Sequence, residues 1–277
     1  GYEQYTPEAL ERDRYSGQFR SATRVDTAAA AAAARGNTER LDELTAASFD
    51  TSRVTLPLGG DVEGSSVLRA QILLDRAGFS PGEIDGRWGD NTENAVSWFQ
   101  QTHDLTATGV IDSATYRRLE ERAGRPARLL VSYVVTPEDA RAAYAPLPAD
   151  IYQKAEQDSL GYESFAEALG ERFHTSPGLL ARLNTQASLD SPRAGDTLRV
   201  PNLADARARR GSVARLVVSG EGRYLHAVDA AGRILYHFPA TLGASYDPSP
   251  QGAFEVTSVT RNPWWHYQPD LLADVPD

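Results

Sequence analysis

The sequence of 277 residues contains neither cysteine nor methionine. The lack of cysteine excludes disulfides, thiolate metal ligands and a cysteine nucleophile within these residues. The chain begins at Gly1 and not at a methionine, so we expect either that an export signal has been removed or that the sequence is a fragment. No run approaches the ~20 consecutive apolar residues of a membrane-spanning helix, so no membrane span is expected.

Basic residues are scarce, with 28 Lys and Arg against 38 Asp and Glu, which gives a formal net charge of −10. Nucleic-acid binding depends on neutralising phosphates with cations, so this balance argues against a nucleic-acid partner. One basic stretch reads either as a patch for an anionic polymer or as a solvated linker between domains. Nothing aromatic interleaves with its cations, which favours the linker. These cations are Arg207, Arg209, Arg210 and Arg215.

Hydrophobic residues make up 41% of the chain, enough for packed cores. The length exceeds one domain of about 100–200 residues and predicts two or three domains, with a multidomain α+β fold. Residues 1–57 are expected to form a helical, partly disordered lead, in which the alanine run at 28–34 favours a helical spacer. Pro57, Gly59 and Gly60 predict its boundary.

Residues 61–124 are expected to form a compact unit of three helices. A second helix can be capped by Asn91 or Thr92, and a third by Asp112. The first helix, ending at Gly78, has apolar residues at spacings of three, four and three, the pattern of a buried helical face. These residues are Val67, Ala70, Leu74 and Ala77.

The run at 84–100 resembles the peptidoglycan-binding domain family, whose signature D-G-x-x-G-x-x-T-x-x-A-V-x-x-F-Q is matched at every position. The glycines permit a tight loop, Thr92 can cap the helix, and the apolar positions form a buried stripe. Much of the motif therefore serves folding. The resemblance implies cell-wall binding, with Asp85, Trp88 and Trp98 as candidate contacts, although either tryptophan could instead belong to the core.

Residues 129–202 are expected to form a second unit in the order strand, helix, helix, strand. The strands are predicted at 131–135 and 197–201, with one helix after Tyr162 and another capped by Ser176.

The stretch from 162 to 202, which ends in A-G-D-T-L-R-V-P-N, resembles a LysM module. Such modules bind glycans that contain N-acetylglucosamine, and the resemblance makes Asn184 a candidate wall contact. Residues 137–159 are an insertion that a compact LysM module lacks, and this insertion could cover the sugar groove.

Residues 213–277 are expected to be β-rich, with a strand at 213–219 and a hairpin of 223–228 and 233–239. Because a zinc site needs three or four ligands, we expect His226 and His237 to be ordinary surface or half-buried residues, with no metal and no cofactor. Successive side chains of a strand point to opposite faces of its sheet, so the side chains of the hairpin divide into two sets. One face is predicted to hold Leu225, Ala227, Ile234, Tyr236 and Phe238; the other, Tyr224, His226, Leu235 and His237.

From Arg215 onward the sequence resembles the first part of a YkuD-type L,D-transpeptidase catalytic domain. The strand pair is followed by T-L-G at 241–243 and by P-S-P-Q-G-A-F-E-V at 248–256, close to the family's T-P-x-G-x-F-x-I with serine replacing threonine. N-P-W-W at 262–265 is close to its N-P-x-W motif. The resemblance implies a substrate groove shaped by Asn262, Trp264, Trp265 and Tyr267.

Members of that family attack a stem peptide with a cysteine assisted by a histidine, and neither motif occurs here, so no catalytic residue is assigned. We expect the whole protein to be a peptidoglycan L,D-transpeptidase, periplasmic or extracellular and wall-associated, and this chain to be truncated and inactive alone. The alternative is a non-catalytic peptidoglycan-binding scaffold. A glycan hydrolase would need two suitably spaced carboxylates, and the sequence singles out no such pair.

Overall fold

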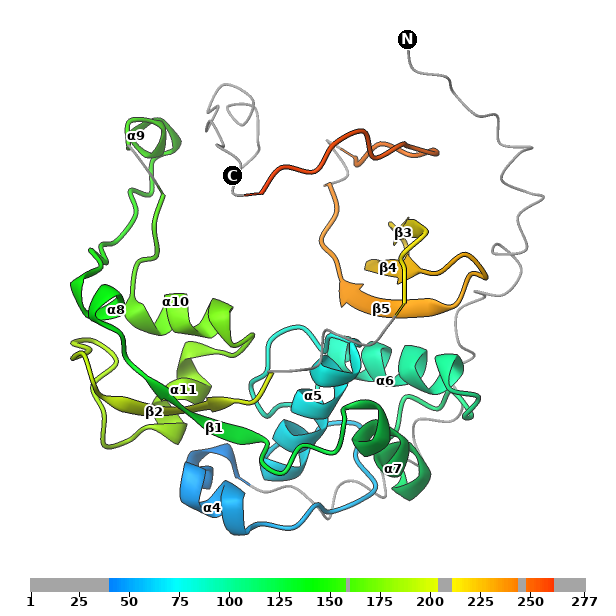
Figure 1. Cartoon of the computed structure of the whole chain (residues 1–277), viewed down its shortest axis with the longest axis horizontal. Helices are drawn as coiled ribbons and strands as arrows, with labels where there is room; N and C mark the ends of the chain where they lie inside the picture. The colour runs from blue at the N-terminus through cyan, green and yellow to red at the C-terminus, as the bar shows by residue number, and fades with distance from the viewer. Residues whose placement is uncertain (1–39, 158–159, 204–210, 244–247, 262–277) are drawn as a thin grey trace.

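The computed structural model describes residues 40–157, 160–203, 211–243 and 248–261 (Figure 1). Helices and small antiparallel sheets combine in a mixed α/β architecture, which confirms the α+β prediction at this coarse level. The described part of the chain contains no helix long and apolar enough to span a membrane. The alanine run expected to be a helical spacer lies outside the described residues.

The three expected helices are α5 (Ser65–Ala77), α6 (Asp90–Thr102) and α7 (Ser113–Arg122). The predicted apolar face of α5 is buried, and Gly78 ends the helix in the left-handed conformation with a φ of 80°. Asp112 caps α7 as predicted, since its side chain accepts a 2.7 Å hydrogen bond from the Thr115 N–H.

The predicted cap of α6 is wrong. This helix begins at Asp90, and Gly89, two to three residues before the expected caps, occupies the N-cap position without a side-chain hydrogen bond. Thr92 is buried inside the first turn, and its hydroxyl lies 3.4 Å from the Gln71 amide nitrogen. The threonine therefore binds a neighbouring helix and does not cap its own.

The second unit contains β1 (Leu130–Val134), α10 (Phe165–Arg172), α11 (Pro177–Leu183) and β2 (Thr197–Pro201) in the predicted order. The two strands pair antiparallel, with Ser132 opposite Arg199. A small core lies between the strand pair and the helices. It is formed by Val135, Phe165, Leu169, Leu180, Leu198 and Val200.

The insertion between β1 and α10 holds two short helices, α8 (Pro137–Arg141) and α9 (Ile151–Ala155). The first packs onto the small core through Ala140. In Figure 1, α9 stands away from α10 and α11 at the end of two extended arms. Among the described residues of the insertion, packing on the small core is found in its first half, through Ala140 and Tyr144.

The third unit is a sheet in the order β3 (Arg215–Ser219), β4 (Tyr224–Val228), β5 (Ile234–Pro239). The hairpin agrees with the sequence, but the predicted face of Ile234 is wrong. A register shift next to Ala227 and Val228 pairs Val228 with Ile234 and leaves Leu235 as an extra residue. Ile234 therefore joins the face that packs on the helices.

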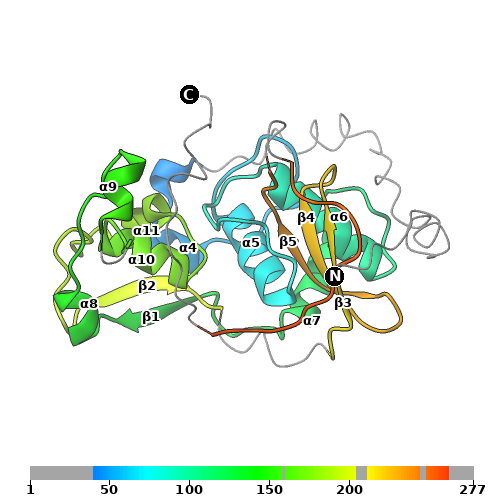
Figure 2. The same ribbon diagram turned by 90° about the horizontal axis from the view of Figure 1, so that it is seen from above.

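The helical unit separates the two β units, with α5 between them in Figure 2. The third unit is joined to it by backbone hydrogen bonds: the His237 N–H donates to Gly78 O, and the Ser80 N–H donates to His237 O, both at 2.9 Å. Val228 and Ile234 of the sheet belong to the same buried cluster as the helical core.

The end of the expected lead is folded onto this assembly. It forms a 3₁₀ turn, Leu41–Glu43, and α4 (Ala46–Thr51), which Thr45 caps through a capping box. Its buried apolar residues share one cluster with α5, β1 and α11. Residues 41–51 therefore join the helical unit to the second unit.

Candidate functional site

The signature loop after α5 is organised by one glutamine. Gln71 Nε2 donates to Asp85 Oδ1 at 3.0 Å and to Arg87 O at 2.9 Å. Its Oε1 accepts from the N–H groups of Asp85 at 3.2 Å and Gly86 at 2.8 Å. Gln71 is 1% exposed, so this amide satisfies backbone groups that water reaches poorly.

A second glutamine, the last residue of the signature, does the same for the next loop. Gln100 Nε2 donates to Val110 O at 2.8 Å and Thr115 Oγ1 at 3.0 Å. Its Oε1 accepts from the N–H groups of Thr108 at 2.9 Å and Gly109 at 3.0 Å. The helical unit thus repeats one device, a buried helical glutamine that holds a glycine loop.

Sequence reasoning missed both roles, although a signal existed. Asp85-Gly86 precedes Thr92 by the same spacing that separates Thr108-Gly109 from Thr115. Comparing the two stretches would have revealed the repeat and directed attention to the helix before each loop, which carries the glutamine.

The predicted wall contacts of the helical unit have structural partners. Asp85 Oδ1 accepts hydrogen bonds from Gln71 and from the Arg87 N–H at 2.8 Å. Trp88 is 9% exposed and lies in the main core. Trp98 is half-buried under the third unit, 5.1 Å from the Tyr224 ring and 4.6 Å from the His226 ring. These positions favour structural roles, and wall contact by these residues stays a prediction.

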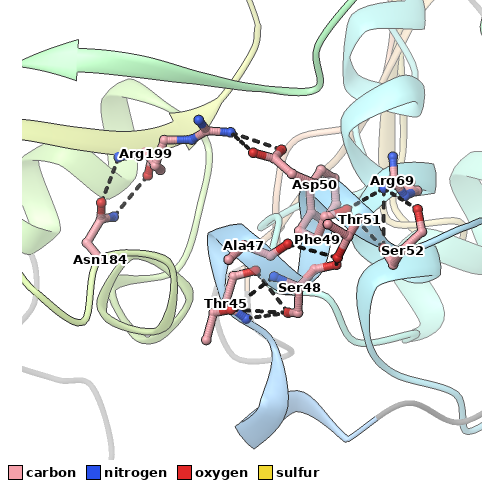
Figure 3. Close-up of polar contacts among 10 residues, drawn as sticks. All are labelled: Thr45, Ala47, Ser48, Phe49, Asp50, Thr51, Ser52, Arg69, Asn184 and Arg199. Carbon is pink, nitrogen blue, oxygen red and sulfur yellow. Dashed lines mark hydrogen bonds and ion pairs between the residues drawn. The ribbon is translucent and has the colours of Figure 1, made fainter.

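Asn184, the predicted contact of the second unit, ties α11 to β2. Its Nδ2 donates to Leu180 O at 2.8 Å and Arg199 O at 2.9 Å, and its Oδ1 accepts from the Arg199 N–H at 2.6 Å. Figure 3 shows Arg199 reaching from this point to Asp50 of α4, where its guanidinium bonds both carboxylate oxygens at 2.8 and 3.0 Å. Asn184 therefore positions the strand that contacts α4.

The other face of the signature loop is covered by the second unit. The Ile84 N–H donates to His174 O at 2.8 Å, and Ile84 O accepts from Thr175 Oγ1 at 2.7 Å and the Ser176 N–H at 3.1 Å. His174 Nδ1 lies 2.8 Å from a carboxylate oxygen of Asp75 on α5. The two units therefore meet at the residue that opens the signature run.

A polar cluster fixes the start of the insertion. The Tyr133 hydroxyl and the Arg172 guanidinium both contact Asp139, and the Thr136 N–H donates to the same carboxylate at 2.9 Å. Burial opposes ionisation of Asp139, but the hydrogen bonds from Tyr133 and Thr136 outweigh it and lower the pKa of its carboxyl.

The two histidines of the hairpin are buried, which contradicts the expected surface or half-buried position. His226 and His237 are 0% and 1% exposed, and His226 Nε2 lies 3.0 Å from His237 Nδ1. They occupy opposite positions on β4 and β5, on the sheet face against α6. Burial lowers the pKa of His226 to about 3, with a contribution from His237, and lowers the pKa of His237 to about 4.

The substrate groove implied for the third unit falls largely outside the described residues, as do Asn262, Trp264, Trp265 and Tyr267. Residues 248–261 are described, and all of them except Ser249 are solvent-exposed. No group of three or more His, Asp or Glu side chains placed to hold a metal ion occurs in the described ranges.

Comparison with known proteins identifies the helical unit. Residues 63–119 match the family described as "Putative peptidoglycan binding domain". The chain is also 38% identical over 66 residues to the carboxy-terminal processing protease CtpB of Bacillus subtilis (strain 168). That match covers 24% of this chain and 14% of the protease. Residues 63–119, which contain all three helices almost completely, are thus a peptidoglycan-binding domain.

Proposed function

We propose that this chain directs a cysteine-dependent peptidoglycan L,D-transpeptidase to the cell wall, in the periplasm or outside the cell. The match of residues 63–119 to the peptidoglycan-binding family carries the wall-directed part of the proposal. The βααβ order of the second unit and its resemblance to LysM modules suggest a second contact with the glycan. Two modules joined by hydrogen bonds would raise the concentration of wall substrate near an attached catalytic domain.

The third unit supports the enzyme. Its outward face carries Leu216, Val218 and Phe238 at 51%, 54% and 42% exposure, and β3 has an open edge within the described part of the chain. Apolar faces and free strand edges promote association unless other polypeptide covers them. The remaining strands of a transpeptidase domain would provide that cover, and the nucleophile would have to lie among them because these residues hold no cysteine.

The second candidate is a non-catalytic scaffold that binds peptidoglycan. The same family match supports it, and it requires no further residues.

The coding sequence after codon 277 and an assay of the whole protein distinguish the two candidates. The enzyme predicts a downstream cysteine and thiol-dependent exchange of the terminal D-alanine of a stem tetrapeptide, abolished by a Cys→Ser change. An immediate stop codon, with a stable monomeric product, would support the scaffold.

A further inference from the structure

A cavity of about 730 Å³ lies where α4, α5 and α7 meet the segment at 125–129. Its size falls in the range of pockets that hold small ligands. Phe49, Leu73 and Leu129 supply apolar lining, and charged side chains surround them. None of the residues predicted from the sequence as wall contacts lines this cavity.

One wall of the cavity is a fixed arginine. Arg69 lies over the Phe49 ring, with its guanidinium carbon 4.3 Å from the ring centroid. It donates to Phe49 O and, at 2.9 Å, to Ser52 O, as Figure 3 shows. Its Nε is buried and has no hydrogen-bond partner among the described residues. Its hydrogen bonds all use Nη2, so the guanidinium is held in place while Nη1 keeps its donor capacity for a ligand.

The segment after α7 adds two more cations. Arg125 has a φ of 45°, an unfavourable conformation for a residue with a side chain, and its N–H donates to Glu120 O at 2.8 Å. Its guanidinium is 3.5 Å from an exposed Glu121 carboxylate, a weak pairing in water. Arg128 is exposed, and no ion pair of its side chain is found within the described ranges.

Two carboxylates, those of Asp50 and Glu120, and the phenol of Tyr116 also line the cavity. Asp50 is held by Arg199, which leaves Glu120 as the carboxylate available to a ligand ammonium. Burial raises the pKa of the Tyr116 phenol, Glu120 raises it further, and Arg69 lowers it. Tyr116 is therefore neutral at physiological pH and can donate to a carboxylate.

We propose that this cavity binds the carboxylate-bearing peptide stem of peptidoglycan, an inference that rests on the proposed wall binding. Guanidinium groups match carboxylates in charge and in fork geometry, and Glu120 matches the free amine of a diamino acid. An uncharged glycan offers no anion to the three arginines, so the sugar chain fits this cavity less well than a carboxylate does.

The test measures binding of a synthetic stem tetrapeptide with a free terminal carboxylate to the full chain by calorimetry. Arg128→Glu reverses an exposed cation at the cavity and should fold normally. Arg117→Glu, on the exposed face of α7 and away from the cavity, is the matched control. Sedimentation with purified sacculi is measured for each protein, so that wall binding is scored separately.

Arg128→Glu, or amidation of the peptide terminus, should weaken peptide binding at least about tenfold, the loss expected for one charge-assisted hydrogen bond. Arg117→Glu should bind as the wild type does. Absence of peptide binding, or equal binding by Arg128→Glu, would overturn the cavity assignment even if the chain sediments with sacculi. Peptide binding by a chain that fails to sediment would instead contradict the proposed function and support the cavity.

Discussion

The buried pair His226 and His237 should make the chain acid-sensitive well above the pH at which its carboxylates titrate. Aromatic rings pack on the pair: Tyr224 stacks on His226, Phe79 stacks on His237, and Trp98 meets His226 edge-on. Burial is the largest cause of both lowered pKa values, and His237 adds to the effect on His226. Protonation of the folded pair therefore brings positive charge into the buried interface between the sheet and α6, which is unfavourable.

The lowered pKa values determine whether the free energy of unfolding rises or falls with pH. An unfolded histidine has a pKa of 6.5, whereas the folded pair titrates at about 3 and about 4. The stability that the neutral pair contributes is complete above about pH 6.5 and declines as the pH falls toward the folded values. Each histidine costs ~1.36 kcal/mol per pH unit in that window, about 2 kcal/mol at pH 5 and about 4 kcal/mol for the pair.

Urea unfolding between pH 8 and pH 5, followed by tryptophan fluorescence, measures this effect. Trp98 lies next to His226 and reports on the interface directly. The matched variant His226→Gln/His237→Gln keeps the other three histidines, His103, His174 and His266, so the difference between the two proteins isolates the buried pair. Between pH 8 and pH 5, we expect the free energy of unfolding of the variant to fall by about 4 kcal/mol less than that of the wild type.

Two results would refute this reasoning. The first is the same pH dependence in wild type and variant. The second test does not need a folded variant: calorimetry of the wild type at pH 5 should detect the uptake of about two protons on unfolding beyond that of the other three histidines. A smaller uptake would mean that the pair is already protonated in the folded state.

Three further perturbations follow from the contacts. Gln71→Ala should lower the free energy of unfolding, measured in urea titrations, by about 3 kcal/mol, because the buried amides of the loop lose their acceptor. The control Gln101→Ala, at an exposed position, should change it by less than about 0.5 kcal/mol. Gly86→Ala should lower the midpoint of thermal unfolding through a loss of about 1–2 kcal/mol, since its φ of 79° is left-handed; an unchanged midpoint would contradict this. A double-mutant cycle on Asp50 and Arg199 should give a coupling below about 1 kcal/mol, reduced by salt, because the carboxylate is half-exposed.

Local pattern predicted much of the fold. The apolar spacing of α5, the Asp112 cap and the Ser176 cap each follow from neighbours within one or two helical turns, and the structure confirms them. The βααβ order of the second unit was predicted for the same reason. Such features depend on short-range geometry, which the order and spacing of neighbouring residues reveal.

The features of the fold that the sequence did not predict depend on contacts between distant segments. Leu235 reads as an ordinary alternating residue, and only its pairing with the neighbouring strand makes it the extra residue that turns Ile234 inward. The two histidines read as surface residues until the sheet is placed on α6. Phe49 was predicted to belong to a helical, partly disordered lead, but it is 1% exposed between two units.

The central claim, that residues 63–119 bind peptidoglycan, is tested most directly by sedimentation of the full chain with purified sacculi. We predict saturable binding that soluble muropeptides compete away, with a natively folded protein of similar net charge staying in solution. A folded chain that remains in the supernatant at every sacculus concentration would contradict the claim.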